Sequence, residues 1–270
     1  MFDQVIVIAG VARSGTSWLG QIIDSSPDVA YRFQPLFSYA FKGAINPDSS
    51  REEYEHFFKY IYLSNDEFLL QTDKRDEGLY LVFKEKNENP RFLAFKTCRY
   101  QYILNKMLYY FDNVKLIGII RHPCGVINSW LKNPKEFPQG ADSIKEWRFA
   151  ACKNLGREEE FFGYYKWKEV AYIYLDLKEK YPNNVYIVKY EELVDNPIPV
   201  SKSIYDFLGL EFKNQTISFL ENCHSINKEG PYAVFKDKSV KDSWKSELYR
   251  YIINEIYLDL EGTRLAQFLK

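Results

Sequence analysis

Cysteine and histidine are scarce in this chain. Its 270 residues include 4 cysteines and 3 histidines. The cysteines stand at positions 98, 124, 152 and 223 and form no C-x-x-C pair, and the histidines do not stand at the spacing of a ligand pair. Zinc sites and disulfide scaffolds both need such clusters. We therefore expect reduced thiols and no metal site.

An excess of either charge is also missing. The chain carries 36 Lys and Arg against 37 Asp and Glu, which gives a formal net charge of −1. This balance creates no overall field that would attract nucleic acid or an anionic membrane surface. We therefore expect no nucleic-acid partner, although the balance leaves room for a local basic pocket.

Long apolar segments are lacking too. The N-terminal apolar run follows Asp3 and ends at Arg13. It is too short for the core of a secretory signal and far too short to span a bilayer. We expect a soluble, cytoplasmic protein without a transmembrane segment. The sequence does not define an oligomeric state.

The chain does contain a regular alternation of short apolar runs and longer segments with helical spacing. Apolar runs of this kind are typical of buried parallel strands, and their alternation with helices indicates an α/β fold with a central parallel sheet. The length fits one domain, with residues 35–90 as a variable insertion over the sheet. The predicted strands are 5–9, 29–33, 92–97, 114–120 and 185–188, and the predicted helices are 17–26, 54–62, 100–110, 123–131, 142–151, 157–181, 197–208 and 246–260.

The first of these strands leads into a glycine-bounded turn. Gly10 to Gly15 matches the first six positions of the phosphate-binding pattern G-x-x-x-x-G-K-[ST]. The backbone N–H groups of such a turn form an anion site at a helix N-terminus. Thr16 replaces the lysine of the pattern, and a different cation, Arg13, stands two residues before the second glycine. This departure argues against a bound nucleotide triphosphate with magnesium.

A second candidate anion site follows the fourth predicted strand. Arg121 stands at the carboxyl end of that strand, and Ser129 comes eight residues later on the next helix. An arginine in this place can bind a phosphate with both arms of its guanidinium, and a serine two helical turns along can face the same oxygens. The pattern is weak alone, but it gains weight because it follows the glycine-bounded turn in the right order.

Together these segments resemble the sulfotransferase superfamily. Its first phosphosulfate-binding loop reads [KR]-S-G-T-[ST]-W or -L, which stands here as Arg13 to Trp18. Its 3′-phosphate site reads R-[DN]-P with a serine at the same spacing, and here His122 takes the middle position. Tyr190-Glu-Glu-Leu193 resembles the Y-E-[DE]-L segment of the family. The resemblance spans most of the chain and lies closer to the bacterial and carbohydrate-type branch than to the small-phenol branch.

The resemblance implies a fold, a reaction and a set of site residues. The fold would be a three-layer P-loop-like arrangement, and the reaction would move a sulfuryl group, without metal, from 3′-phosphoadenosine 5′-phosphosulfate (PAPS) to a hydroxyl or amine acceptor. The product nucleotide would be 3′-phosphoadenosine 5′-phosphate (PAP). Ordinary packing is the alternative explanation for the two aromatic residues of the set, Trp18 and Tyr190. The implied donor-binding residues are Arg13 at the bridging oxygen, the N–H groups of Ser14, Gly15, Thr16 and Ser17 around the 5′-phosphosulfate, Arg121 and Ser129 at the 3′-phosphate, and Trp18 and Tyr190 near the adenine.

The catalytic base is the least defined part of this resemblance. Carbohydrate-type members carry a glutamate just after the second strand, where this chain has Gln34. Small-molecule members use the histidine of a K-T-H segment, where this chain has Lys96-Thr-Cys98. An amide takes no proton, and a buried thiol usually acts as a small apolar group. Gln34 and Lys96 stay among the catalytic candidates, and His224, in a late loop, is an outside candidate for the base.

Two other functions stay open at this point. The altered base positions are compatible with a non-catalytic nucleotide-binding protein of the same fold, and a nucleotide kinase is disfavoured by Thr16. The Gln34-Pro-Leu context favours a carbohydrate or a related hydroxyl as the acceptor. The family closes its donor site with a basic C-terminal loop, so the resemblance makes Lys236, Lys238 and Lys241 candidates for the 3′-phosphate. A lysine-rich loop is usually just solvated, and we favour that explanation for each lysine individually.

Overall fold

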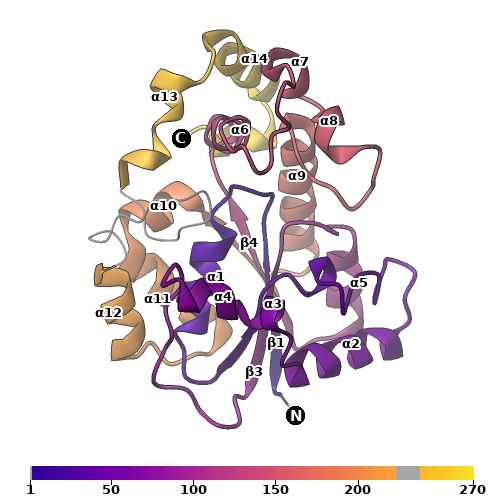
Figure 1. Cartoon of the computed structure of the whole chain (residues 1–270), viewed down its shortest axis with the longest axis vertical. Helices are drawn as coiled ribbons and strands as arrows, with labels where there is room; N and C mark the ends of the chain where they lie inside the picture. Colours follow the sequence, from indigo (N-terminus) through magenta and orange to yellow (C-terminus); the bar gives the residue numbers. More distant parts are fainter. Residues whose placement is uncertain (1, 223–237) are drawn as a thin grey trace.

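The structure is a computed structural model that describes residues 2–222 and 238–270. Within this part of the chain five strands form one parallel sheet with helices on both faces, as Figure 1 shows. The order across the sheet is β2-β3-β1-β4-β5. The α/β fold with a central parallel sheet is confirmed, and each predicted strand lies within one residue of the observed bounds. The strands are β1 Gln4–Ala9, β2 Val29–Arg32, β3 Phe92–Thr97, β4 Val114–Ile120 and β5 Val185–Lys189.

Strand β1 occupies the centre of the sheet. It pairs in parallel with β3 on one side and β4 on the other, so that Val7 lies opposite Phe95 and Leu116. A strand in this position has neighbours on both edges and helices on both faces, which explains its continuous apolar sequence. Since all the strands run the same way, their carboxyl ends meet at one edge of the sheet.

One face of the sheet is covered by four helices. Ile6 and Ile8 of β1 pack in a buried cluster with apolar side chains from these helices, among them Ile22 and Tyr205. In Figure 1 these helices lie to the left of the sheet. They are α1 Thr16–Asp24, α10 Tyr190–Asp195, α11 Pro197–Leu208 and α12 Asn214–Asn222.

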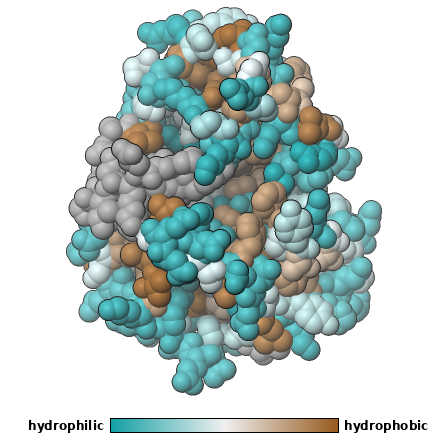
Figure 2. Space-filling view, viewed as in Figure 1, coloured by the Kyte–Doolittle hydropathy of each residue, from teal (hydrophilic) through white to brown (hydrophobic). Residues whose placement is uncertain are grey.

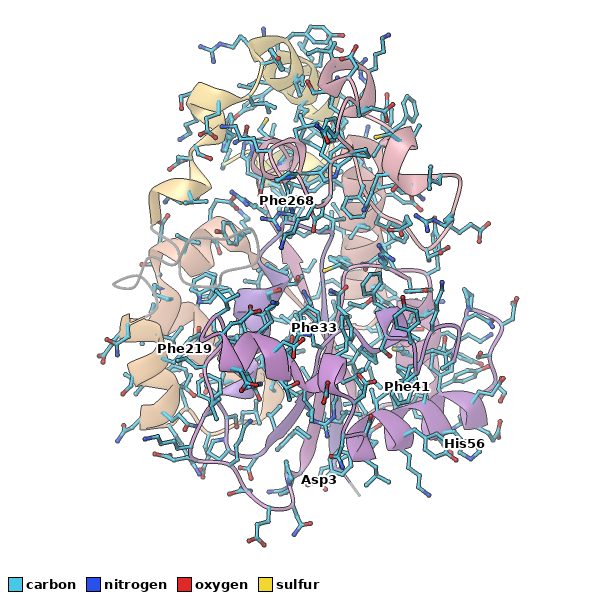
Figure 3. All side chains as sticks on the ribbon, viewed as in Figure 1. Asp3, Phe33, Phe41, His56, Phe219 and Phe268 are labelled. Atoms are coloured by element: carbon cyan, nitrogen blue, oxygen red, sulfur yellow. The ribbon has the colours of Figure 1, made fainter. Side chains whose placement is uncertain are left out.

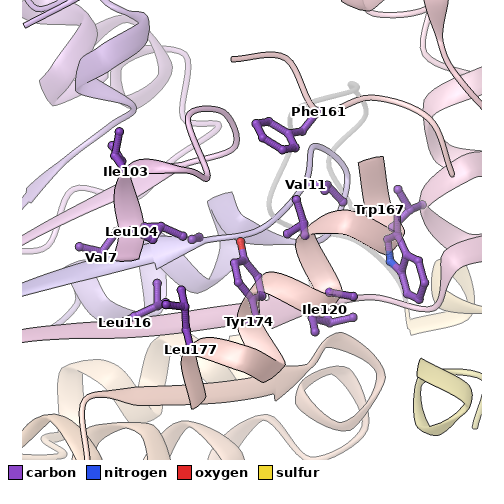
Figure 4. Close-up of a cluster of buried hydrophobic side chains, with 14 of the residues drawn as sticks. Val7, Val11, Ile103, Leu104, Leu116, Ile120, Phe161, Trp167, Tyr174 and Leu177 are labelled. Atoms are coloured by element: carbon purple, nitrogen blue, oxygen red, sulfur yellow. The ribbon is translucent and has the colours of Figure 1, made fainter. Parts of the chain in front are cut away.

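The opposite face carries α2 Arg51–Leu63, α5 Ile103–Tyr110 and α9 Tyr164–Lys180. Figure 4 shows the buried cluster between the sheet and α9, where Tyr174 reaches in towards the strands. The Tyr174 hydroxyl donates a hydrogen bond of 2.8 Å to Gln101 Oε1. Its polar end is therefore satisfied inside an apolar layer.

A helical cap lies above the carboxyl edge of the sheet, at the top of Figure 1. Its first helix, α6, begins at Pro123, where the missing N–H and fixed φ of proline suit the first turn. The C-terminal part of the chain returns over α6 and packs against it. The elements of the cap are α6 Pro123–Leu131, α7 Ser143–Glu146, α8 Ala151–Asn154, η2 Lys238–Lys241, α13 Trp244–Glu247, α14 Arg250–Leu260 and η3 Arg264–Phe268.

The predicted helices of this cap were too long. Residues 142–163 contain two helices of four residues each, and α9 begins at Tyr164 instead of residue 157. Ala150, Leu155 and Gly163 all have positive φ, which interrupts a right-handed helix. The predicted helix 246–260 is likewise divided, because Leu248 is extended between α13 and α14.

The connection from β2 to β3, residues 33–91, holds η1 Pro35–Phe37, α2, α3 Glu67–Leu70 and α4 Thr72–Asp76. It is fixed to α1 through Asp24, whose carboxylate is 3% exposed at the end of that helix. Lys86 Nζ donates to Asp24 Oδ1 at 2.8 Å, and Arg75 Nη2 donates to Oδ2 at 2.7 Å. Burial alone would raise the pKa of Asp24, but the two cations outweigh it and hold that pKa below its ordinary value.

We expect the change Asp24→Asn to lower the free energy of unfolding by about 3 kcal/mol, because it leaves two partly buried cations without their anion. Urea denaturation at neutral pH measures this loss. The matched control is Asp3→Asn, which breaks the exposed ion pair with Arg91 and should cost less than about 1 kcal/mol. Equal losses in the two variants would contradict a structural role for the buried pair.

Candidate active site

The turn between β1 and α1 has the geometry that its glycines predict. Arg13 has a φ of 72° and Gly15 a φ of 91°, both in the left-handed region. A Cβ on Gly15 would lie 2.6 Å from the Tyr190 ring. Position 15 therefore requires glycine for its backbone conformation and for the close approach of Tyr190. The turn ends at Gly15, and the first turn of α1 follows it.

A cavity of about 670 Å³ opens at this turn. The face seen in Figure 2 is hollowed near its middle, with apolar side chains beside the hollow. The lining includes residues from the segments that follow all five strands, at the edge where a doubly wound sheet places its ligands. We call one part the anion end, lined by Arg13, Ser17, Arg121, Ser129 and Tyr190, and another part the aromatic end, lined by Phe33, Phe37, Phe68 and Tyr80.

Arg13 connects the two segments that the sequence singles out. Its Nε donates to Ser129 Oγ at 3.1 Å, and its carbonyl oxygen accepts from Arg121 Nη1 at 3.1 Å. The turn after β1 and the helix after β4 are thus held together by side chains of both candidate anion sites. The structure brings Arg13, Arg121 and Ser129 into one cavity, as the sequence predicts.

Arg121 lies at the carboxyl end of β4 and is 5% exposed. Its guanidinium stacks over the Tyr190 ring at 4.7 Å, and Nη2 donates to the Val240 carbonyl at 3.1 Å. Within the described residues its Nε is buried and has no hydrogen-bond partner. A buried donor of this kind is costly unless a ligand or water accepts from it, and an anion in the cavity would meet that need.

Two aromatic side chains border the anion end. The Trp18 and Tyr190 rings meet edge to face, with their centroids 6.4 Å apart. Trp18 is 6% exposed and belongs to the buried cluster on the α1 face of the sheet, and both side chains line the cavity. This placement fits contact with a nucleotide base, and it also accounts for both residues as packing.

The hydroxyls that follow the turn lie beside Lys96, on β3. Lys96 Nζ donates to Ser17 Oγ at 2.8 Å and to Thr16 Oγ1 at 3.3 Å, and Cys98 Sγ lies 3.1 Å from Thr16 Oγ1. Burial lowers the pKa of Lys96, although Cys98 and Glu136 nearby act in the opposite direction. Ser14 differs from expectation, since its N–H donates to the Val11 carbonyl within the turn and its side chain is fully buried.

The aromatic end is built on the chain that leaves β2. Phe33 lies near the centre of the view in Figure 3, and its ring contacts the rings of Phe68 and Tyr80 at 5.5 and 6.3 Å. Lys96 Nζ lies 4.4 Å from the centre of the Phe33 ring. Gln34, next to it, has a φ of 41° and lines the cavity. The two catalytic candidates Gln34 and Lys96 therefore lie in the same part of the cavity.

Glu136 is a cavity residue that the sequence argument missed. Its Oε1 lies 3.9 Å from Arg13 Nη1, and its side chain is 14% exposed. It stands seven residues after Ser129, in the turn beyond α6. In the sequence, only its position just after the predicted helix 123–131 could have pointed to Glu136 as a site residue. A single carboxylate in a loop forms no recognisable motif.

Comparison with known proteins bears on this geometry. A model of the sulfotransferase family matches residues 5–214, well over half of the chain. The chain belongs to this family. The matched region contains both the turn after β1 and the Arg121 to Ser129 segment, and it ends before the C-terminal part of the cap.

Individual sulfotransferases resemble the chain at low identity. Carbohydrate sulfotransferase 1 from Danio rerio is 21% identical over 322 residues, which cover 92% of this chain and 74% of that protein. The sulfotransferase domain from the curacin biosynthetic pathway superposes with a TM-score of 0.57 at 19% identity, covering 96% of this chain and 98% of that one. Mouse sulfotransferase SULT7A1 complexed with PAP gives a TM-score of 0.58 at 15% identity, with 100% and 88% covered. These structures show a common fold.

Two of the three histidines of this sulfotransferase lie within the described residues. His56 is exposed on α2 at the edge of the molecule, away from the cavity (Figure 3). His122 stacks on Trp244 with centroids 4.3 Å apart, and burial, together with the cations of Arg121 and Lys245, lowers its pKa to about 4. It is therefore neutral and packed at ordinary pH. The candidate base His224 lies outside the described residues.

The basic C-terminal segment is only partly described. Lys236 and the side chain of Lys238 lie outside the described residues, and Lys241 forms an ion pair with Asp195. Among the residues that the structure describes, no group of three or more potential ligands could hold a metal ion. None of the described helices has the length and apolar character needed to cross a membrane.

Proposed function

We propose that this sulfotransferase takes PAPS as its donor and transfers the sulfuryl group to a hydroxyl acceptor. The observation that carries the donor assignment is the convergence of Arg13, Arg121 and Ser129 at the anion end of one cavity. Two guanidinium groups beside a strand-turn-helix suit a ligand with two separate phosphate groups better than one with a single phosphate chain. The SULT7A1 structure, which is complexed with PAP, supports the same donor.

The described residues fit an in-line transfer. The acceptor oxygen would attack sulfur, the bond between sulfur and the bridging oxygen would break, and its electron pair would stay on the 5′-phosphate of PAP. Arg13 would stabilise that developing charge, and the N–H groups at the start of α1 would hold the phosphosulfate. Arg121 and Ser129 would hold the 3′-phosphate, with the buried Nε of Arg121 available as a donor.

For the acceptor we propose a carbohydrate or a related hydroxyl compound with one flat apolar face. The aromatic rings of Phe33, Phe37 and Phe68 line the aromatic end of the same cavity. Aromatic side chains bury large flat apolar surfaces, and a sugar ring or an aryl group presents such a face. The Danio rerio relative, whose name is that of a carbohydrate sulfotransferase, supports testing sugars first.

Thermal unfolding with different nucleotides tests the donor. At one hundred times its dissociation constant, a ligand of the folded state adds about 2.7 kcal/mol, so PAP should raise Tm clearly. ATP with magnesium should raise it no more than adenosine 5′-phosphate does, because Thr16 stands where a kinase needs lysine. A Tm that responds to ATP with magnesium and not to PAP would favour the kinase alternative. Transfer of labelled sulfate from PAPS to an acceptor panel separates an enzyme from a non-catalytic nucleotide binder.

A further inference from the structure

The cavity contains a carboxylate, although its two expected base positions hold neither a carboxylate nor an imidazole. Gln34 and Cys98 occupy the two positions at which relatives would carry Glu or His, and neither is a carboxylate or an imidazole. Glu136 lines the same cavity as both of them. Its charge also favours the protonated form of Lys96, which lines the cavity as well.

The two oxygens of Glu136 have different surroundings. Oε1 lies 3.9 Å from Arg13 Nη1. Within the described residues, Oε2 is buried and has no hydrogen-bond partner. A buried carboxylate oxygen without a donor is unfavourable in a resting protein, and the hydroxyl of an acceptor would supply the missing donor. The carboxylate thus faces a cation with one oxygen, while its other oxygen lacks a donor among the described residues.

The turn that carries Glu136 is held firmly. The N–H groups of Glu136 and Phe137 donate to the Asn133 carbonyl at 3.0 and 2.8 Å. The Phe137 ring packs edge to face on the buried Trp130 ring, with centroids 5.2 Å apart. A base must be positioned by its surroundings to take a proton efficiently. These contacts hold the backbone of Glu136 and the residue that follows it.

The other carboxylates that line the described part of the cavity are Glu67 and Asp73, and both are exposed. The ionisable groups around Glu136 in the cavity are cations, apart from the Cys98 thiol: Arg13 on the turn after β1, Lys96 on β3, Lys135 on its own turn and Lys153 on α8. Lys96 is a poorer candidate for the base because its Nζ already donates to the hydroxyls of Thr16 and Ser17.

We propose that Glu136 is the general base of the transfer, an inference that rests on the proposed function. As the acceptor oxygen bonds to sulfur, its proton passes to Glu136 Oε2. The bond from sulfur to the bridging oxygen breaks at the same time, and its electrons stay on the 5′-phosphate beside Arg13. Glu136 later releases the proton to water. One cation would therefore orient the base and stabilise the leaving group.

The test compares the transfer of labelled sulfate from PAPS by Glu136→Gln and by the parent. The acceptors are a panel of sugars, aliphatic alcohols and phenols. A reaction without added acceptor measures transfer to water. We expect kcat to fall by about 10²–10⁴-fold, the contribution typical of a positioned base. The loss should be larger for weakly acidic alcohols than for acidic phenols, because a phenol gives up its proton with less help.

Three controls keep the outcome interpretable. Glu136→Asp keeps the charge but shortens the side chain, so it should show a smaller loss of kcat than Glu136→Gln. Glu158→Gln changes an exposed glutamate away from the cavity lining and should leave kcat unchanged. The dissociation constant for PAP and the Tm of each variant report on binding and folding.

Each result decides the inference. A Gln variant that folds, binds PAP more tightly and keeps the kcat of the parent would show that Glu136 only balances Arg13 in the empty site, and this would overturn the inference while leaving the proposed function intact. A parent that binds PAP but transfers sulfate to no acceptor, including water, would also overturn it. A parent that does not bind PAP would remove the proposed function itself.

Discussion

Replacing Arg13 by alanine is expected to lower kcat by about 10²–10³-fold, with a much smaller change in the KM for PAPS. The guanidinium is held in the cavity by Ser129 and faces Glu136. Its charge matters most when the bridging oxygen becomes anionic, so the interaction is stronger in the transition state than with bound PAPS. An interaction of this kind affects turnover more than binding.

Initial rates over a range of PAPS concentrations separate the two constants. Arg13→Lys should recover part of the activity, since the family pattern accepts either cation at this position. The control is Arg51→Ala, which removes an exposed arginine of α2 that is paired with Glu55. An alanine variant whose KM for PAPS rises while its kcat is unchanged would place Arg13 in binding alone.

Replacing Arg121 by alanine should weaken PAP binding by roughly 1.5–3 kcal/mol, which corresponds to about ten- to one-hundred-fold in Kd. The affinity for adenosine 5′-phosphate should change much less, because that nucleotide lacks the 3′-phosphate that Arg121 is proposed to hold. Titration calorimetry with both nucleotides gives the difference directly.

The comparison of two nucleotides is needed because Arg121 also has structural contacts. It donates to the carbonyls of Arg13 and Val240 and stacks on Tyr190, so its removal will disturb the anion end in general. General damage would weaken both nucleotides alike, whereas loss of the 3′-phosphate contact would weaken PAP selectively. If the parent already binds PAP and adenosine 5′-phosphate equally well, the assignment of Arg121 and Ser129 is wrong.

The sheet and the anion end could be predicted because short-range patterns determine them. The central strands are buried on both faces, so their sequences are continuously apolar. The apolar runs at 5–9 and 114–120 therefore predicted β1 and β4. The turn after β1 was predicted from the spacing of Gly10 and Gly15. Each of these signals lies within a few consecutive residues.

The cap and Glu136 could not be predicted in the same way. The helices at 142–163 were predicted too long because left-handed residues such as Ala150 and Leu155 carry no local signal in their side chains. Tertiary contacts determine their conformation, as where Asn154 bonds the backbone of Phe149 and Phe162. Glu136 reaches Arg13 through the packing of Phe137 on Trp130, which a one-dimensional pattern does not contain.

The strand order β2-β3-β1-β4-β5 separates the proposed nucleotide-binding residues from the proposed acceptor-binding residues. The residues proposed to hold the nucleotide follow β1, β4 and β5, while Gln34 and the aromatic end belong to the single connection that leaves β2 and returns at β3. That connection is fixed to the rest of the fold at Asp24, on the far end of the helix whose first turn faces the anion end. The segment between β2 and β3 could therefore be replaced, by evolution or by design, while the ion pairs of Lys86 and Arg75 with Asp24 are kept. Such exchanges would combine the same donor-binding residues with different acceptor sites.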